Sequence, residues 1–342
     1  MPSSVRFLNP AEAARRLGVS TKALRLYERR GLVAPRRTAA GWRAYGPQEM
    51  ARAGQIVALR ALGLSLARVA QVLDGDSQAL EPALAAHQAS LEQQGRQLAE
   101  AVEKVRELRA GLARGRTPDT EDLASLLTSV GGPSVAFDLP WPWGGEPFTL
   151  CDIPPLTYIT GPLGSGKTRL ALRLAETLSG ATFLGLDRLA DDGAAVGARL
   201  EADPDLATRV DRTLSWLVED GATPSNDLLV LLAALQAEPA AALVIDMPEQ
   251  GLDRSTQTAL VAWLRRRGLD APPVFLLTRS SAILDPPAVG TGETILYCPA
   301  NHAPPIRVAP YPGAPGFEAV ASCLASPEVR ARTAGMIAVM AG

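Results

Sequence analysis

The chain of 342 residues has few of the side chains that build metal sites and disulfide frameworks. It has two histidines and three widely separated cysteines, Cys151, Cys298 and Cys323, with no Cys-x-x-Cys pair. A zinc site of the usual spacing is therefore not expected, and neither is a disulfide-stapled fold. No apolar run approaches 18 residues and the first ten residues lack the apolar core of a signal peptide, so we expect a cytoplasmic protein with no membrane partner.

Basic residues are concentrated at the beginning of the chain. Residues 1–73 contain 13 Lys/Arg and 3 Asp/Glu, whereas the remaining residues contain 21 and 33. A basic segment joined to an acidic one suggests that only the first meets a polyanion, although charge alone does not exclude a surface without such a partner. The length suits two domains and a connector, and 47% hydrophobic residues are enough for a core.

The first 75 residues have the pattern of a helix-turn-helix domain. Asn9-Pro10-Ala11-Glu12 combines an N-cap residue, a proline at the first helical position and an acid at the third, which predicts a helix that runs to Gly18. After this glycine turn, Ser20 is expected to cap a second helix over 21–30. Two short helices joined in this way have helix-turn-helix proportions, but the pattern alone is weakly specific.

The second expected helix and the hairpin-like stretch after it mix basic and aromatic residues. Basic groups can neutralise phosphates while rings pack on sugars or groove walls. The alternative is that the aromatic residues, Tyr27, Trp42 and Tyr45, are the small core of the domain. The residues expected at DNA are Thr21, Lys22, Arg25, Tyr27, Arg37 and Arg43.

Over about 70 residues the chain resembles the MerR family, through residues 17–20, 23–32, 41–45 and 62–66. The resemblance implies a dimer on double-stranded promoter DNA, with RNA polymerase as a further partner. It also implies that the second helix enters the major groove, with Arg25 and Tyr27 at DNA and Arg43 on the wing. Leu26 departs from the two aromatics usual in this helix, which affects one backbone contact rather than the fold.

A heptad pattern follows the basic segment and predicts a dimerising helix over 76–114, with homodimer contacts through 78–113. Its middle is polar, which weakens the seam and helps to fix its register. The alternative is an amphipathic helix lying on its own domain. MerR-like proteins place their dimerising helix here; metal-sensing members then have cysteine ligands, and their absence before Cys151 disfavours metal sensing. The seam positions are Leu84, Leu91, Leu98, Val105 and Leu112, with Leu80, His87, Gln94, Ala101 and Leu108.

Glycines and prolines mark a linker over 115–134, and the next domain is expected over 135–342. Within it, 156–160 reads as a buried strand that leads into Gly-Pro-Leu-Gly-Ser-Gly-Lys-Thr at 161–168, and a helix follows. This is the GxxxxGK[ST] phosphate loop in its required setting. Backbone N–H groups would surround the β-phosphate, Lys167 would reach the β- and γ-phosphates, and Thr168 would bind Mg²⁺.

A second element is expected to supply the acid on the metal side. Residues 242–246 are an apolar run that ends in Asp246, and together with 247–253 and 274–285 they resemble ABC-type ATPases, closest to the AAA/SMC-like ones, over about 135–300. Thr168 and Asp246 would hold Mg²⁺. The residues expected to bind nucleotide are Gly161, Gly164, Ser165, Gly166, Lys167, Thr168, Asp246 and Arg279.

Several residues depart from that resemblance. Met247 replaces the carboxylate that activates water, Arg279 replaces the switch histidine, and His302 lies too late to substitute for it. The Q-loop glutamine and the signature glycines are not visible. Because phosphoryl transfer depends on a positioned water, we expect nucleotide binding with slow or no hydrolysis. Glu249 is the candidate for the missing base, and Arg279 either pairs with the γ-phosphate or is a surface residue.

The sequence thus predicts a multidomain protein: an all-α winged helix-turn-helix (1–75), a coiled-coil helix, a linker, and an α/β P-loop NTPase domain with a final helix around 327–340. The favoured function is a DNA-binding regulator, nucleoid-associated on DNA, that responds to ATP-Mg²⁺. The alternatives are an active DNA-dependent ATPase and a regulator whose P-loop domain binds a partner or another ligand. No base-reading NKxD motif is seen, and the ABC resemblance favours ATP over GTP.

Overall fold

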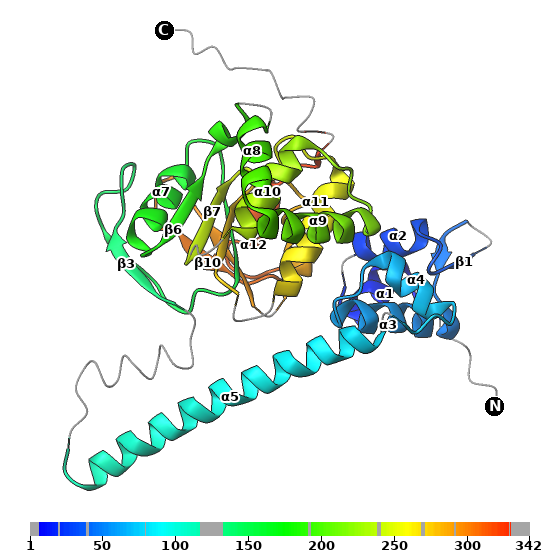
Figure 1. Cartoon of the computed structure of the whole chain (residues 1–342), viewed down its shortest axis with the longest axis horizontal. Coiled ribbons are helices and arrows are strands. Elements are labelled where there is room, and N and C mark those ends of the chain that lie inside the picture. The colour runs from blue at the N-terminus through cyan, green and yellow to red at the C-terminus, as the bar shows by residue number, and fades with distance from the viewer. Residues whose placement is uncertain are drawn as a thin grey trace. The chain divides into compact units, whose positions relative to one another are not determined.

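The computed structural model divides the chain into two compact units, residues 1–87 and 88–342 (Figure 1). No helix among the described residues is both long and apolar enough to cross a membrane. Ser20, most of the linker at 115–134 and nearly all of the final helix expected at 327–340 lie outside the described residues. The structure describes residues 7–19, 21–38, 41–78, 80–116, 133–190, 193–237, 241–267, 271–290, 292–327 and 329.

The first helix begins where the sequence predicts it. The Asn9 side chain accepts a hydrogen bond from the Glu12 amide at 2.9 Å, and the Glu12 carboxylate accepts one from the Asn9 amide at 3.2 Å. These reciprocal bonds satisfy two N–H groups that a helix start leaves without partners. The helix ends at Gly18, whose φ of 68° is in the left-handed region. The predicted helix, glycine turn and second helix are therefore confirmed.

The first unit also contains a short antiparallel hairpin, so the expectation of an all-α domain is wrong. Gly41, just before the second strand of this hairpin, has a φ of 78°, and the Thr38 amide donates a hydrogen bond to the Trp42 carbonyl at 2.8 Å. The elements of this unit are α1 (Pro10–Leu17), α2 (Thr21–Arg29), β1 (Arg36–Arg37), β2 (Arg43–Ala44), α3 (Pro47–Ala61), α4 (Leu66–Leu73) and the start of α5 (Leu80–Ala113).

Helix α5 occupies the span in which the heptads predict a helix. Its 34 residues give it a length of about 50 Å. Four apolar seam side chains are exposed: Leu84 by 47%, Leu91 by 53%, Val105 by 40% and Leu112 by 54%. The side chains of the seam residues Gln94, Leu98 and Ala101 lie outside the described ones. Dimerisation through this helix stays a prediction.

A six-stranded sheet in the order β10-β9-β5-β8-β7-β6 forms the centre of the second unit. The strands from β9 to β6 run parallel, and β10 is antiparallel to β9. A separate hairpin of β3 and β4 precedes it. The strands are β3 (Val135–Asp138), β4 (Pro147–Leu150), β5 (Leu156–Thr160), β6 (Ala181–Leu184), β7 (Ala242–Asp246), β8 (Val274–Leu277), β9 (Glu293–Tyr297) and β10 (Ile306–Val308).

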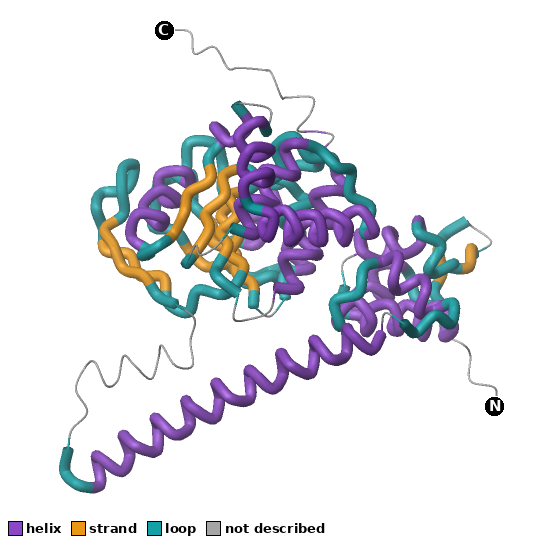
Figure 2. The backbone as a smooth tube through the Cα atoms, in the orientation of Figure 1, coloured by secondary structure: helices purple, strands orange, loops and turns teal. Residues whose placement is uncertain are grey.

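Helices cover both faces of this sheet (Figure 2). One face carries Tyr158, Ile245 and Leu276 and packs against residues of α9, α10, α11 and α12. The other carries Val244 and Phe275 and packs against α7 and the β3–β4 hairpin. The helices of this unit are α7 (Lys167–Thr177), α8 (Ala194–Ala202), α9 (Pro204–Glu219), α10 (Asn226–Gln236), α11 (Arg254–Leu264), α12 (Phe317–Cys323) and the 3-10 helices η1 (Leu186–Leu189), η2 (Arg265–Arg267) and η3 (Pro286–Ala288).

The strand order decides which loops meet. β8 lies between β5 and β7 and is parallel to both, so the segments that leave their carboxyl ends emerge at one edge of the sheet. These segments carry the glycine loop 161–166, Asp246 and Arg279. The fold therefore brings together three stretches that are spread over more than a hundred residues of the sequence. The α/β class expected for this region agrees with the sheet that is observed.

Candidate DNA-binding and phosphate-binding sites

Most of the residues predicted to meet DNA are exposed on α2 and on the hairpin β1–β2. Thr21, Lys22 and Arg25 are exposed on α2, and Arg37 and Arg43 are exposed on the hairpin. The Arg37 Nη1 donates to the carbonyl of Gly41 at 3.1 Å, which helps to brace the turn. The surface of the first unit thus presents cations on two neighbouring elements, as a phosphate-binding surface requires.

Tyr27 is buried, which corrects the prediction that its side chain is presented to DNA. Its side chain is 6% exposed and packs in the core of the first unit with Leu24 and Ile56. Leu24 and Tyr27 are three residues apart on α2 and so face the same side of the helix. The interpretation of the aromatics as core is right for Tyr27 and for Tyr45, which is 0% exposed, and wrong for Trp42, which is 75% exposed.

Glu28 joins α2 to the hairpin, a role that sequence reasoning missed. Its Oε2 accepts a bond from Arg43 Nε at 2.7 Å, and its Oε1 accepts one from the buried Tyr45 hydroxyl. Burial raises the pKa of Tyr45, and the bond to Glu28 raises this pKa further. A lone acid in a strongly basic helix was the available signal. Its effect is to fix where Arg43 stands relative to Arg25.

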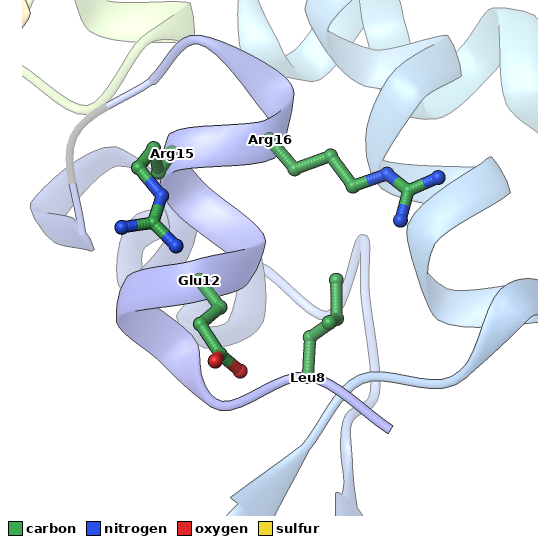
Figure 3. Close-up of a pocket in the computed structure, with 4 residues that line it drawn as sticks. All are labelled: Leu8, Glu12, Arg15 and Arg16. Atoms are coloured by element: carbon green, nitrogen blue, oxygen red, sulfur yellow. The ribbon is translucent and has the colours of Figure 1, made fainter. Parts of the chain in front are cut away.

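A shallow cavity of about 220 Å³ lies on the first unit beside α1 (Figure 3). Leu8, Glu12, Arg15 and Arg16 line it, and the two arginines extend to different sides of the helix. Glu12 is already used in the cap of α1. The cavity thus adds exposed positive charge to the surface of this unit without an obvious set of converging polar groups.

In the second unit, the glycine loop 161–166 curls tightly between β5 and α7. Gly161 has a φ of 155°, and a Cβ there would stand 2.3 Å from the Cys298 carbonyl oxygen. Gly166 has a φ of 89°, and a Cβ there would stand 2.6 Å from the Trp143 ring. Only glycine fits both the conformation and the space. The predicted setting of strand, loop and helix is confirmed, because α7 begins at Lys167.

Lys167 folds back onto this loop. Its Nζ donates to the carbonyls of Gly161 at 2.9 Å and Pro162 at 2.6 Å, and to Ser165 Oγ at 3.3 Å. Burial lowers the pKa of Lys167, and the charge of Arg279 contributes to this shift. The exposed Arg279 is thus close enough to Lys167 to affect it. Two cationic side chains, Lys167 at the start of α7 and Arg279 after β8, thus lie near the amino end of a helix, an arrangement that attracts anions.

Thr168 and Asp246 face each other across the sheet edge. The Thr168 hydroxyl donates to Asp246 Oδ2 at 3.4 Å, a long bond. Burial raises the pKa of Asp246, although the Thr168 hydroxyl and the charges of Arg188 and Lys167 oppose the shift. The two residues predicted to hold Mg²⁺ are therefore neighbours, each with an oxygen that a hard cation prefers.

Glu249 is held between two loops. Its side chain is 5% exposed, and its carboxylate accepts bonds from the Thr278 hydroxyl at 2.9 Å and the Arg279 amide at 3.3 Å. It thereby ties the segment after β7 to the segment after β8. Its role as a catalytic base stays a prediction, and these bonds give it a structural role in any case.

Two groups distant in the sequence complete the surroundings of the glycine loop. The His302 ring nitrogen Nε2 lies 3.2 Å from the Gly164 carbonyl, and the Trp143 indole donates to the Ala303 carbonyl at 3.0 Å. His302 lies too late in the sequence to replace the switch histidine. The structure nevertheless brings it to the loop, which no local pattern could have shown.

The fold of the first unit defines a class of protein: a winged helix-turn-helix, with an exposed basic α2 and hairpin and a long helix after them. The family model for MerR helix-turn-helix regulatory proteins matches residues 8–76. A probable heavy metal-dependent transcriptional regulator from Haemophilus influenzae is 37% identical over 105 residues, which cover 29% of this chain and 82% of that protein. The chain therefore belongs to the MerR family of transcriptional regulators.

Two solved structures are also similar to part of the chain. The transcriptional regulator SkgA from Caulobacter crescentus has 33% identity over 35% of this chain and 86% of its own, with a TM-score of 0.24. HiNmlR, a MerR family regulator that lacks the sensor domain and was solved bound to promoter DNA, has 20% identity over 32% of this chain and 92% of its own, with a TM-score of 0.25.

Proposed function

We propose that this MerR-type regulator binds double-stranded promoter DNA as a homodimer and that its second unit binds ATP-Mg²⁺ as an effector, with weak or no hydrolysis. The observation that carries the nucleotide part is the glycine loop 161–166. It joins a buried parallel strand to a helix, requires glycine at two positions, and sets Lys167 and Thr168 at the first turn of that helix. Such a loop suits a polyphosphate.

The DNA part of the proposal is supported by the surface of the first unit. Exposed cations lie on α2 and on the hairpin, and Glu28 fixes the hairpin to α2. Family membership supports the same function, and the Haemophilus influenzae relative is named a transcriptional regulator. The exposed leucines and valine of α5 support the homodimer, because an apolar seam at seven-residue spacing is stabilised by a second helix.

Magnesium fits the residues at the sheet edge. A hydroxyl from Thr168 and a carboxylate from Asp246 are hard oxygen ligands on neighbouring loops. The remaining ligands would be phosphate oxygens and water. When bound, the ion would neutralise phosphate charge; Lys167 and Arg279 supply further positive charge from the protein side.

We expect weak hydrolysis because the residues that follow Asp246 do not supply a free base. Met247 has no group that can activate water, and the Glu249 carboxylate is bonded to Thr278 and Arg279 and is only 5% exposed. A nucleotide that binds without rapid turnover can act through its occupancy. Binding that differs between two arrangements of the dimer is sufficient to shift their populations.

The test is ATP binding by calorimetry together with single-turnover hydrolysis, with and without promoter DNA. Lys167→Ala is the disabling variant, and Arg173→Ala is its control, because Arg173 lies on the same helix and pairs with Glu176 at 3.4 Å. We expect binding without rapid turnover, lost in Lys167→Ala and kept in the control. Rapid DNA-stimulated turnover would establish an ATPase instead, with Glu249 as the first residue to substitute. No binding at all would leave a module for a partner or another ligand.

A further inference from the structure

Arg188 is a buried cation at the sheet edge to which the sequence assigned no role. It lies on η1, directly after the edge strand β6, and is 8% exposed. An arginine is charged at any ordinary pH, and taking this charge out of water is unfavourable unless hydrogen-bond partners compensate for the lost hydration. The hydrogen-bond acceptors around this buried guanidinium therefore indicate its role.

The guanidinium donates to backbone carbonyls rather than to a carboxylate. Nη1 donates to the carbonyl of Asp246 at 2.8 Å and Nη2 to the carbonyl of Met247 at 2.8 Å. Nη1 also bonds the Gly185 carbonyl at 2.6 Å, which anchors Arg188 to its own turn. The buried Nε has no hydrogen-bond partner within the described part of the chain. The fork thus spans two consecutive carbonyls at the point where β7 ends.

This point is conformationally unusual. Met247 has a φ of 48°, a left-handed conformation that is unfavourable for a residue with a side chain. Its amide donates to the Leu277 carbonyl on β8 at 3.0 Å, and its carbonyl accepts from Arg188. The Met247 residue is therefore held from two sides, and the turn that follows the Asp246 carboxylate is fixed by these bonds.

Arg265 shows the contrasting use of an arginine in the same unit. It pairs with the Glu293 carboxylate, with Nε 2.9 Å from Oε1 and Nη2 3.0 Å from Oε2. Such a pair stabilises the fold at a place away from the glycine loop. Arg188 has acidic residues near it, including Asp227, yet its guanidinium donates to backbone carbonyls, one of them that of Asp246.

We propose that Arg188 is a positioning residue of the phosphate site: it fixes the backbone at Asp246 and Met247 so that the Asp246 carboxylate faces the Thr168 hydroxyl and takes the metal of a metal–nucleoside triphosphate. The proposal rests on the proposed function of the second unit. Arg188 acts through Asp246 and does not touch the ligand. It therefore governs the metal-dependent part of binding, whereas the glycine loop and Lys167 govern the metal-independent part.

The experiment compares ATP affinity with Mg²⁺ and with a chelator in the full chain by calorimetry. Arg188→Met is expected to weaken binding with Mg²⁺ by about 10-fold or more, the usual effect of removing a group that orients a metal ligand, and to change chelator binding by less than about 2-fold. Arg188→Lys keeps the charge but cannot donate to both carbonyls in the same way, so its ATP affinity with Mg²⁺ is expected to lie between those of the wild type and Arg188→Met. Arg265→Met is the control: it removes another arginine–partner contact and should leave the Mg²⁺ dependence unchanged.

A second readout needs no nucleotide. Amide hydrogen exchange in the free protein should speed up at Met247 in Arg188→Met and stay at the wild-type rate in Arg265→Met. Wild-type Mg²⁺ dependence in both Arg188 variants would overturn the proposal while leaving nucleotide binding intact. If the wild type itself binds no ATP, the proposed function fails, and this proposal fails with it. If Arg188→Met does not fold, Arg188→Lys tests the proposal through the same comparison of ATP affinity with Mg²⁺ and with a chelator.

Discussion

The two units bind anions, as we propose, by opposite means. The first presents cations on the outside of α2 and the hairpin, where Arg25 and Arg43 are exposed. The second uses the backbone of the loop 161–166 and a few partly buried side chains, and Lys167 is satisfied by three oxygens of the loop itself. Exposed cations suit a long polyanion that they contact at many points. A small ligand has few contacts, so each donor must be in place beforehand.

This difference implies different tolerance to substitution. A surface of separate cations loses binding in small increments, because each contact is one of several. A loop whose backbone does the binding fails as a whole when its path changes.

Gly161→Val should have the largest effect. Its Cβ would meet the Cys298 carbonyl oxygen at 2.3 Å at a φ of 155°, so the loop must move. We expect a loss of about 3 kcal/mol or more in the unfolding free energy of the second unit, with no detectable ATP binding. Urea denaturation and calorimetry measure the two. Gly164→Ala is the matched control: its Cβ meets nothing within 4 Å, so only the φ of 78° opposes it, at about 1–2 kcal/mol. Equal losses would contradict the argument from space.

Leu91→Asp tests whether the protein forms a dimer through α5. Leu91 is 53% exposed on α5 and lies in the apolar seam. A carboxylate at this position in both helices should raise the dimer dissociation constant by about 100-fold or more, because the dimer would lose the burial and packing of two leucines. Sedimentation equilibrium measures this. Ala89→Asp places the same charge at an exposed position outside the seam and should leave the dimer unchanged. A dimer that survives Leu91→Asp would place the interface elsewhere.

Arg25→Ala and Arg43→Ala compare two cations of the first unit: within the described residues no acid is bonded to Arg25, whereas Arg43 pairs with Glu28. Each phosphate contact contributes about one unit to the slope of log affinity against log salt, so Arg25→Ala should lower the slope by about 1. Arg43→Ala should lower it by less, because Glu28 already neutralises Arg43 at 2.7 Å. Salt titrations of DNA binding measure both slopes. Arg199→Ala, an exposed cation on α8, should change neither, and a full unit lost with Arg43→Ala would mean that DNA displaces Glu28.

Asp246→Asn should have the smallest effect on the free protein. Burial raises the pKa of Asp246 above its ordinary value, so the charged carboxylate destabilises the fold once the pH exceeds the pKa it has in the unfolded chain. This destabilisation grows as the pH rises and is complete above the folded pKa. The variant should therefore have a melting temperature at neutral pH equal to or slightly above that of the wild type, and no Mg²⁺-dependent stabilisation by ATP. Thermal melts at pH 4 and pH 7 test the sign: the advantage of the variant should shrink at pH 4.

Sequence patterns predicted those parts of the structure that are held by hydrogen bonds between residues close in the sequence. The start of α1 follows from Asn9 and Glu12, which bond each other within one turn. The strand, loop and helix around Lys167 follow from a motif in which Gly161 and Gly166 have no substitutes. The family resemblance predicts Tyr27 at DNA, whereas its three-residue spacing from Leu24 indicates the buried face of α2, where the structure has it.

What local patterns could not show are contacts across the fold. Arg188 reaches the Asp246 carbonyl from 58 residues away, and His302 reaches Gly164 from 138 residues away. Each depends on which strand lies beside which, and the order β5-β8-β7-β6 is decided by the packing of the whole sheet. Glu28 is an intermediate case, since the contact joins α2 to a hairpin only 15 residues later.

The pairing between Ala325 and the segment after β8 has a practical consequence for handling this protein. The Ala325 amide donates to the Arg279 carbonyl at 2.9 Å, and its own carbonyl accepts from Ser281 at 2.9 Å. A shortened chain that stops before Ala325 would remove both bonds and release the loop that carries Arg279. A stop placed after Val329 would keep them. Expression variants of the second unit should therefore retain residues through 329, with any affinity tag joined beyond that point by a flexible spacer.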